Sequence, residues 1–455
     1  MLHPSLGICL ALTALAVSAP LASRAEEAQG RDVVGVGAVL PHRQRAAVVN
    51  EILEERLARL LPDLMRETDI DMWLVINREY AEDPVYLTLV PEPVFSARRT
   101  TMLVFFDRGE QAGLERLTVS RYPLQGLYEP AWKGGSREDQ WTRLAEIVRE
   151  RNPERIGVNV SRDWAFGDGL SAGLRQQLGE ALGPELEERV VSAEELCVRW
   201  LETRTPRELE IYAHAVALAR GVIAEAFSSR AITPGATTAD DVRWYVRERF
   251  EELGLDPWFH PDVNVQRQGV DHEPDQPFFG DGDAVIRRGD VLHTDVGICY
   301  LRLCTDTQEM GYVLRVGEED VPAGLREALA VGNRWQDLLT GNFAAGRSGN
   351  EILAAAHAAT DVAEITDRIY THPIGHFGHA PGPTIGMWDD QGLHPVHGDW
   401  TLRPRTCYAI EGNVKVPVPE WGGQLVQIKL EQSAAFDAGD VRYLAGRQTT
   451  WHVVR

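Results

Sequence analysis

The sequence predicts an α/β protein, with an α+β second part, and three observations support this prediction. The chain has 455 residues, which is more than a single hydrophobic core normally supports. Helix-like and strand-like patterns alternate from residue 45 to about residue 200. A strong helix-start signal then opens a second stretch. We therefore expect two domains, residues 26–204 and 205–455, after a leader at residues 1–25.

The leader has the pattern of a secretory signal peptide. An apolar run from Leu6 to Ala22 is followed by Ser23-Arg24-Ala25, a small-x-small site with cleavage expected after Ala25. The run is short for a transmembrane helix, and no later segment is apolar for long enough to span a bilayer. The start of the leader lacks Lys and Arg, so a retained signal anchor stays an alternative. We expect export to the periplasm or secretion, without stable membrane insertion.

The first domain is predicted from short periodic segments. Apolar residues spaced three and four apart predict an amphipathic helix over residues 45–61. Continuous apolar runs predict buried strands at 72–76 and 102–106, a helix follows at 141–148, and a strand at 155–158. Nothing in this stretch resembles a catalytic cluster.

The second domain begins at Thr205-Pro206-Arg207-Glu208, which has a hydroxyl N-cap, proline at the first helical position and Glu three residues after the cap. Residues 232–242 and 343–353 then share one design. In both, a glycine turn precedes a hydroxyl residue and a helix with acids in its first turn. The repeat suggests that this domain contains two similar halves.

Composition excludes several classes of partner. Asp and Glu outnumber Lys and Arg by 68 to 46, giving a net charge of −22, so nucleic acid is not an expected partner. No GxGxxG follows a predicted strand, which argues against a dinucleotide enzyme. The cysteines after the leader match no zinc spacing, and we interpret them as small buried hydrophobic residues: Cys197, Cys299, Cys304 and Cys407.

Two aspartates lie in a predicted β-hairpin. If the hairpin turns at Tyr300-Leu301, Asp295 and Asp306 are direct cross-strand neighbours. Facing carboxylates repel each other, so this pairing requires a cation between them. The alternative is two acids on a solvated strand face.

Three histidines cluster in a segment that cannot form a regular helix. His372, His376 and His379 lie among glycines and prolines between residues 371 and 383. His372 and His376 would share one face of an extended strand. A structural role is the alternative for any one of them, but three together suggest a site.

Two further segments each contribute a glutamate. Glu411 lies in a short apolar run, and Glu431 follows alternating residues in which Lys429 and Glu431 share the polar face. A solvated outer face is again the alternative. Two Asp, two Glu and one His along a predicted sheet suit a pair of first-row divalent ions, with Mn expected and Co or Zn as alternatives.

The order and spacing of these residues resemble those of prolidase and aminopeptidase P in metallopeptidase family M24. The resemblance implies a creatinase-like N-terminal α/β domain and a pita-bread catalytic domain with pseudo-two-fold halves. It also implies a peptide substrate, a homodimer, and hydrolysis of Xaa-Pro bonds near the N-terminus by a hydroxide that bridges two metals. On this basis the metal ligands are Asp295, Asp306, His376, Glu411 and Glu431.

The resemblance also assigns catalytic and substrate residues. Glu411 matches the residue that shuttles the proton, and His372 matches a histidine that contacts substrate four residues before the ligand. His272 is a looser match to an upstream catalytic histidine, and Lys429 stands where proline-specific members often have Arg. The later substrate histidine is absent at Pro383, the simple offset, so we assign its role to His379.

Two other positions depart from the family pattern. Thr307-Gln308-Glu309 replaces x-Thr-Arg after Asp306, and Gly412-Asn413 replaces Pro-Gly after Glu411. Both concern substrate binding, so strict Xaa-Pro specificity, and the choice between dipeptidase and aminopeptidase, stay open. A metal-free creatinase-type hydrolase and a non-catalytic peptide-binding module are the alternatives. Retention of a full ligand set argues against both.

Overall fold

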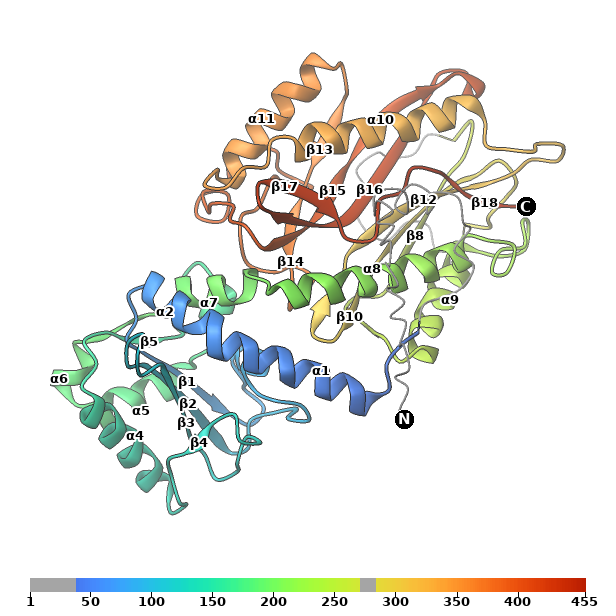
Figure 1. The fold of residues 1–455 in the computed structure, drawn as a ribbon. Helices are drawn as coiled ribbons and strands as arrows, with labels where there is room; N and C mark the ends of the chain where they lie inside the picture. Colours follow the sequence, from blue (N-terminus) through green and yellow to red (C-terminus); the bar gives the residue numbers. More distant parts are fainter. Residues whose placement is uncertain (1–37, 271–283) are drawn as a thin grey trace, which may run out of the picture. The chain divides into compact units, whose positions relative to one another are not determined.

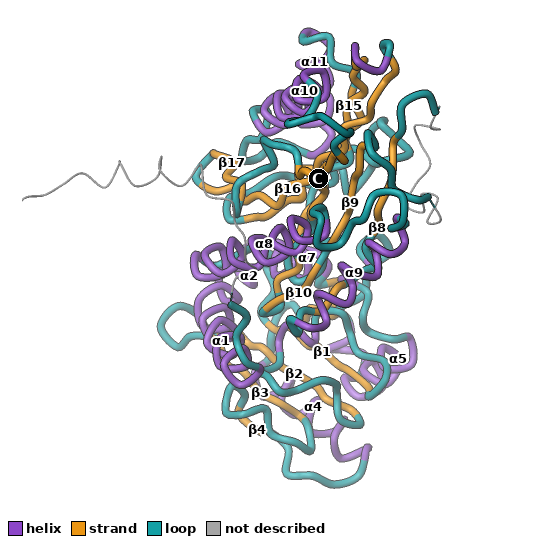
Figure 2. Tube along the Cα trace, turned by 90° about the vertical axis from the view of Figure 1, so that its right-hand side faces the viewer, coloured by secondary structure: helices purple, strands orange, loops and turns teal. Residues whose placement is uncertain are grey.

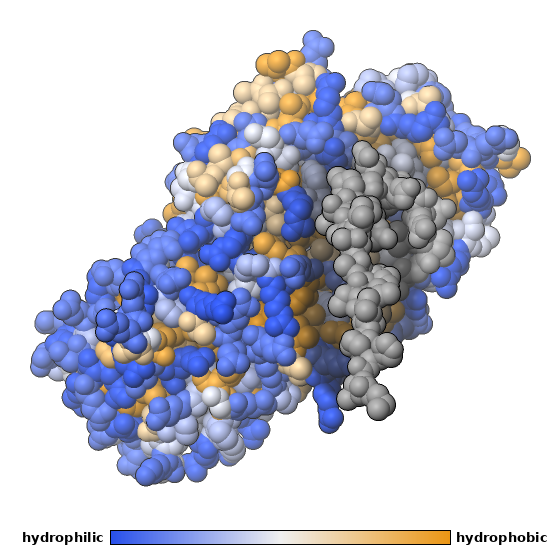
Figure 3. Space-filling view, viewed as in Figure 1, coloured by the Kyte–Doolittle hydropathy of each residue, from blue (hydrophilic) through white to orange (hydrophobic). Residues whose placement is uncertain are grey.

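A computed structural model describes residues 38–270 and 284–455. The leader at residues 1–25 and the candidate His272 lie outside these described residues. Within them, none of the helices has the length and apolar character needed to cross a membrane. Hydrophilic residues dominate the face shown in Figure 3, and apolar residues are scattered among them.

The first domain is built on a six-stranded sheet with the order β4-β3-β2-β1-β5-β6. The predicted strands are confirmed as β1 and β2, which pair antiparallel, and β5, which pairs parallel with β1. Its strands are β1 (Met72–Arg78), β2 (Thr100–Asp107), β3 (Leu114–Val119), β4 (Glu129–Pro130), β5 (Ile156–Val158) and β6 (Val190–Ser192).

Helices pack against this sheet and bury their apolar faces on it. The predicted helix at 45–61 forms as α1 (His42–Glu55), one π-helical turn (Arg56–Leu60) and α2 (Leu61–Glu67). Buried leucines from it join the same core as Trp73 and Phe105 of the sheet. The other helices here are α3 (Tyr86–Leu89), α4 (Arg137–Arg151), α5 (Ala172–Leu182), α6 (Pro184–Glu187) and α7 (Glu194–Glu202).

The second sheet has nine strands, six of them in the order β13-β15-β16-β12-β9-β8. β14 pairs with β15, β17 with β16, and β18 with β12. Its strands are β8 (Asp262–Gln266), β9 (Val291–Val296), β12 (Thr307–Val313), β13 (Asp367–Ile369), β14 (His372–Ile374), β15 (Thr406–Val418), β16 (Gln424–Asp437), β17 (Asp440–Tyr443) and β18 (His452–Val454).

The second domain contains the two similar halves that its sequence suggests. The predicted helix at Pro206 is α8 (Pro206–Ala226), with a capping box between Thr205 and Glu208. The halves continue with α9 (Ala239–Glu252), α10 (Ala323–Thr340) and α11 (Gly349–Val362), and α10 and α11 lie side by side against β15 and β13 in Figures 1 and 2. The N–H of Gly235 before α9 donates to the carbonyl of Ile286, and that of Gly346 before α11 donates to Leu402. Both glycines have positive φ, so the two helix entries are alike in backbone conformation and in hydrogen bonding.

The strand register of the aspartate hairpin differs from the predicted register by two residues. Its arms are β10 (Ile298–Tyr300) and β11 (Leu303–Cys304), and the turn is at Leu301-Arg302, where both residues have positive φ. A two-residue turn of this type matches the twist of paired strands. Asp295 therefore pairs with Gln308 rather than with Asp306.

The cysteine interpretation is wrong for two of the four residues. Cys299 and Cys304 are cross-strand partners in this hairpin and form a disulfide. The corrected register brings them opposite each other, which the predicted register did not. Cys197 and Cys407 are free and buried, as predicted.

Candidate metal centre

A single cross-strand row of the second sheet carries most of the predicted site. Neighbouring strands pair Asp262 with Asp295, Asp295 with Gln308, Gln308 with Glu431, and Glu431 with Glu411. Residues directly opposite one another lie about 4.5–5.5 Å apart at Cβ, and like charges in such positions are destabilising. The register of the five strands therefore concentrates acidic side chains at one place.

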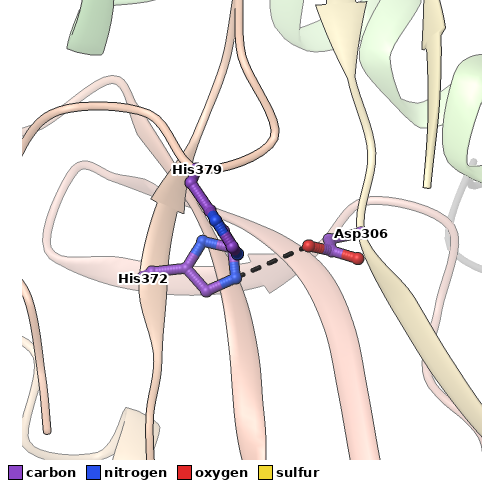
Figure 4. Close-up of side chains that lie close together, drawn as sticks. All are labelled: Asp306, His372 and His379. Carbon is purple, nitrogen blue, oxygen red and sulfur yellow. Dashed lines mark ion pairs between the residues drawn. The ribbon is translucent and has the colours of Figure 1, made fainter. Parts of the chain in front are cut away.

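Asp306 and His372 complete the cluster from neighbouring elements. Asp306 is two residues before Gln308, and His372 begins β14, so each comes from beside the row. His372 Nε2 lies 3.6 Å from Asp306 Oδ2, 3.6 Å from Glu411 Oε2 and 3.4 Å from Glu431 Oε1. Figure 4 shows the His372 ring directed toward Asp306, with the His379 ring beside it.

The ligand atoms fall into overlapping groups. One group is Asp295, Asp306 and Glu431, a second is His372, Glu411 and Glu431, and within each group the atoms lie within 4.8 Å of one another. Glu431 belongs to both. Asp306 also groups with His372 and His379. Two adjacent sets that share a carboxylate have the form of a site for two ions.

The cluster has buried oxygen and nitrogen atoms without partners. Asp295 Oδ1, Asp306 Oδ1, His372 Nε2 and both carboxylate oxygens of Glu431 are buried and accept or donate no hydrogen bond. Unpaired buried polar atoms are costly, and native proteins rarely keep them without a ligand. Carboxylate oxygens and a neutral imidazole nitrogen are the donors that Mn²⁺, Co²⁺ and Zn²⁺ accept, so the residues fit divalent ions.

The electrostatics agree with this chemistry. Burial, and then the charge of Asp262, raises the pKa of Asp295 to about 7. Burial and the neighbouring carboxylates raise the pKa values of Asp306, Glu411 and Glu431 well above their usual range. Burial lowers the pKa of His372 to about 3, so its ring is neutral and can act as a ligand. Bound cations would stabilise the ionised carboxylates.

His376, the predicted histidine ligand, lies elsewhere. Its Nδ1 hydrogen-bonds to the carbonyl of Arg302, its Nε2 is 4.0 Å from Glu208, and burial together with Arg204, Arg56 and Arg302 lowers its pKa. It belongs to none of the ligand groups among the described residues. The structure therefore brings His372, which the sequence assigned to substrate, into the candidate ligand groups in place of His376.

The four-residue shift has two consequences. The resemblance places a substrate histidine seven residues after the histidine ligand, which is Pro383 if the ligand is His376. Counted from His372, the same offset leads to His379, so a histidine is present at this position. The position four residues before the ligand, which the resemblance assigns to substrate contact, is then Arg368 on β13, and Arg368 lies opposite Asn413 of β15.

His379 and Trp258 form an edge of the site. The His379 ring packs against His372 with centroids 4.6 Å apart, and Trp258 packs against His379 at 5.1 Å. A Cβ at Gly297 or Gly378 would clash with the Trp258 indole, so two glycines give this ring its space. Trp258 Nε1 also donates to the carbonyl of Thr305, next to Asp306. Sequence patterns gave no signal for this tryptophan.

Lys429 and two uncharged groups also reach the cluster. The positive charge of Lys429 offsets a small part of the rise in the pKa values of Asp295 and Glu411, so this predicted substrate residue is close enough to act on the carboxylates. Gln308 and His293 were not predicted as site residues. Both could have been found from strand alternation, because His293 is two residues from Asp295 and Gln308 is two from Asp306.

Comparison with known proteins agrees with this geometry. Residues 210–433 match the model of metallopeptidase family M24. No curated protein matches the chain. The fold is similar to that of an X-Pro aminopeptidase from Thermotoga maritima, with TM-score 0.61 and 17% identity over 86% of this chain and 100% of the other.

Two other solved structures share the fold. One is an Xaa-Pro dipeptidase from Bacillus anthracis, with TM-score 0.57 and 16% identity over 90% of this chain and 100% of the other. The other is the N-terminal domain of the FACT complex subunit SPT16 from Cicer arietinum, with TM-score 0.53 and 11% identity over 89% and 99%. Likeness at this identity establishes the pita-bread fold, and a fold can host different functions. The matched segment includes the acidic row and His372. Residues 210–433 are therefore those of metallopeptidase family M24, and this match supports a metal-dependent peptidase.

Proposed function

We propose that this protein is a dinuclear metallopeptidase that cleaves Xaa-Pro bonds near the N-terminus of peptides. The observation that carries the proposal is the pair of ligand groups that share Glu431. One group supplies three carboxylates and the other supplies His372 with two glutamates. Ions bound there would polarise the substrate carbonyl and lower the pKa of a water molecule.

The side chains of the chain have separate roles in this proposal. Glu411 accepts the proton of the attacking water and delivers it to the leaving proline nitrogen, which must be protonated to depart. His379, an exposed residue beside His372, donates a hydrogen bond to the substrate carbonyl region. Trp258 offers an aromatic wall for an apolar ring such as proline.

A metal-depletion experiment tests the proposal. The purified protein is stripped with a chelator, and Xaa-Pro dipeptides and Xaa-Pro-Yaa peptides are assayed before and after Mn²⁺, Co²⁺ or Zn²⁺ is restored. We expect activity only with metal, and a loss of about 10²- to 10⁴-fold in Glu411→Gln, the range for a general acid–base group. Activity that survives metal removal would contradict the proposal. Binding of two ions without peptide cleavage would support a binding module instead.

We further propose that the protein is exported and forms a homodimer. The leader pattern and the Cys299–Cys304 disulfide support export, because disulfides persist in oxidising compartments. Mass spectrometry of the protein from its native host should give a mature N-terminus after Ala25, and an intact leader would contradict cleavage. Analytical ultracentrifugation should give twice the chain mass.

A further inference from the structure

Gln308 occupies an unusual place for a neutral side chain. It is the only uncharged member of the cross-strand row, lying directly between Asp295 on β9 and Glu431 on β16. Its side chain is 3% exposed, so its amide is held by protein atoms rather than by solvent. The N–H groups and the carbonyl oxygen of a buried amide at this place must find hydrogen-bond partners among the neighbouring side chains.

The amide nitrogen contacts two carboxylates. Gln308 Nε2 donates to Asp295 Oδ2 at 3.2 Å and to Glu411 Oε1 at 2.5 Å. The remaining oxygens are the ones directed to the cluster. Asp295 Oδ1 has no hydrogen-bond partner, and Glu411 Oε2 lies 3.6 Å from His372 Nε2. In each acid, one carboxylate oxygen is thereby held by the Gln308 amide, and the other is left to bind an ion.

A chain of hydrogen bonds fixes the orientation of this amide. Gln308 Oε1 lies 2.9 Å from His293 Nε2, and His293 Nδ1 lies 3.4 Å from Asn264 Nδ2. The Asn264 amide also donates to Asp262 Oδ2, and Arg243 donates to Asp262 Oδ1. Because Nδ1 of His293 accepts from Asn264, its Nε2 carries the proton and donates to the Gln308 carbonyl. The flipped amide would direct its carbonyl oxygen at the two carboxylates, which repel it when they are ionised as metal ligands.

We propose that Gln308 is a positioning residue of the metal centre. It holds one oxygen of Asp295 and one of Glu411, so that each acid presents a single oxygen to the ions. A Lys or Arg at this place would add a positive charge that competes with the ions, whereas an amide donates without adding charge. The inference rests on the proposed two-ion function, and it identifies a determinant of metal affinity that the ligands alone do not explain.

Metal titration of the full chain tests the inference. Protein stripped by a chelator is titrated with Mn²⁺ by isothermal titration calorimetry, and the visible spectrum of the Co²⁺ form is recorded. In Gln308→Met, which keeps the side-chain length but not the amide, we expect Mn²⁺ binding to weaken 10- to 100-fold, the range for residues that orient ligands. The Co²⁺ spectrum should also shift, because Asp295 gains a second free oxygen.

A matched variant separates this effect from general destabilisation. Gln140 is also a buried glutamine whose amide makes two hydrogen bonds, to the carbonyls of Thr100 and Val119, in the first domain. Gln140→Met should bind Mn²⁺ as the wild type does. His293→Phe, which leaves Gln308 unoriented, should weaken binding in the same direction but less, by about threefold to tenfold.

The outcomes distinguish the inference from the function on which it rests. Folded Gln308→Met with wild-type Mn²⁺ affinity and an unchanged Co²⁺ spectrum overturns the positioning role. If Gln308→Met does not fold, unchanged affinity in His293→Phe overturns it instead. If the wild type itself binds no metal, the proposed function fails, whatever the variants do.

Discussion

Two buried clusters of charge lie on either side of the segment 372–376, and they differ in one respect. His372 faces the three carboxylates of Asp306, Glu411 and Glu431, several of whose oxygens have no hydrogen-bond partner. His376 faces Arg56, Arg204 and Glu208, where the glutamate accepts from both arginines and from the backbone of Thr205. The second cluster balances its carboxylate with two arginines of the same chain, whereas the first gathers carboxylates that bound cations would neutralise. Both clusters keep buried atoms without hydrogen-bond partners, His376 Nε2 and Arg56 Nε among those of the second, so the balance of charge is what distinguishes them.

The largest expected difference between the two histidines is in metal binding. His372→Ala should lower Mn²⁺ affinity by more than about 100-fold, because residues one step further from the metal already account for 10- to 100-fold. His376→Ala should leave affinity within about threefold of the wild type. Calorimetric titration of both variants decides this, and equal losses would reverse our correction of the ligand.

The arginine cluster should respond in stability instead. Glu208→Gln leaves Arg56 and Arg204 buried with one neutral partner, and breaking a buried ion pair costs about 3–5 kcal/mol in unfolding free energy. In the wild type burial lowers the pKa of Arg56 to about 10 even though Glu208 raises it, and the variant loses that compensating charge. Urea unfolding monitors the loss, and the folded variant should still bind two ions. Loss of metal binding at unchanged stability would show that the clusters are not separate.

The clusters should also have opposite pH dependence. The folded pKa of Asp295 is raised to about 7, so the metal-free protein binds this proton more tightly when folded and loses stability as pH rises. Between pH 5 and pH 7 Asp295 should account for about 2–3 kcal/mol of the loss, which Asp295→Asn should remove, and Mn²⁺ should oppose the loss from the whole cluster.

Glu208 supplies the opposite sign in the same experiment. Burial disfavours its charge, but Arg56 and Arg204 outweigh burial and hold its pKa below the usual value. Its contribution is present above the pKa of the unfolded chain and is lost as pH falls through the folded pKa. Urea midpoints of metal-free protein across pH should therefore show both trends. If the stability of the metal-free protein rises from pH 5 to pH 7, the trend expected from Asp295 is contradicted.

The smallest expected effect concerns the hairpin beside the two clusters. Cys299→Ser with Cys304→Ser opens a short loop, for which chain entropy predicts about 2 kcal/mol of lost stability. Thermal unfolding with and without reductant measures it. The reductant should have no effect on the double variant, and a wild type insensitive to reductant would contradict a stabilising disulfide.

Much of the fold follows from local patterns in the sequence. The Thr205 capping box, the runs at 72–76 and 102–106, and the paired glycine turns at 235 and 346 each form as expected. These features depend on neighbours within a few residues, which the sequence contains. The hairpin register could not be predicted, because nothing in Leu301-Arg302 favours positive φ.

The sequence by itself predicted the acidic ligand set, Asp295, Asp306, Glu411 and Glu431, from the order and spacing that resemble those of the family, and the structure brings these four acids together. Only the tertiary structure decided which histidine joins them. His372 and His376 are the same residue type only four positions apart, and their difference lies in the residues that β15 and α8 bring to each. Only the structure, likewise, placed Gln308 between Asp295 and Glu411. A cross-strand contact depends on register, and register is fixed by turns and packing far from the residues that it brings together.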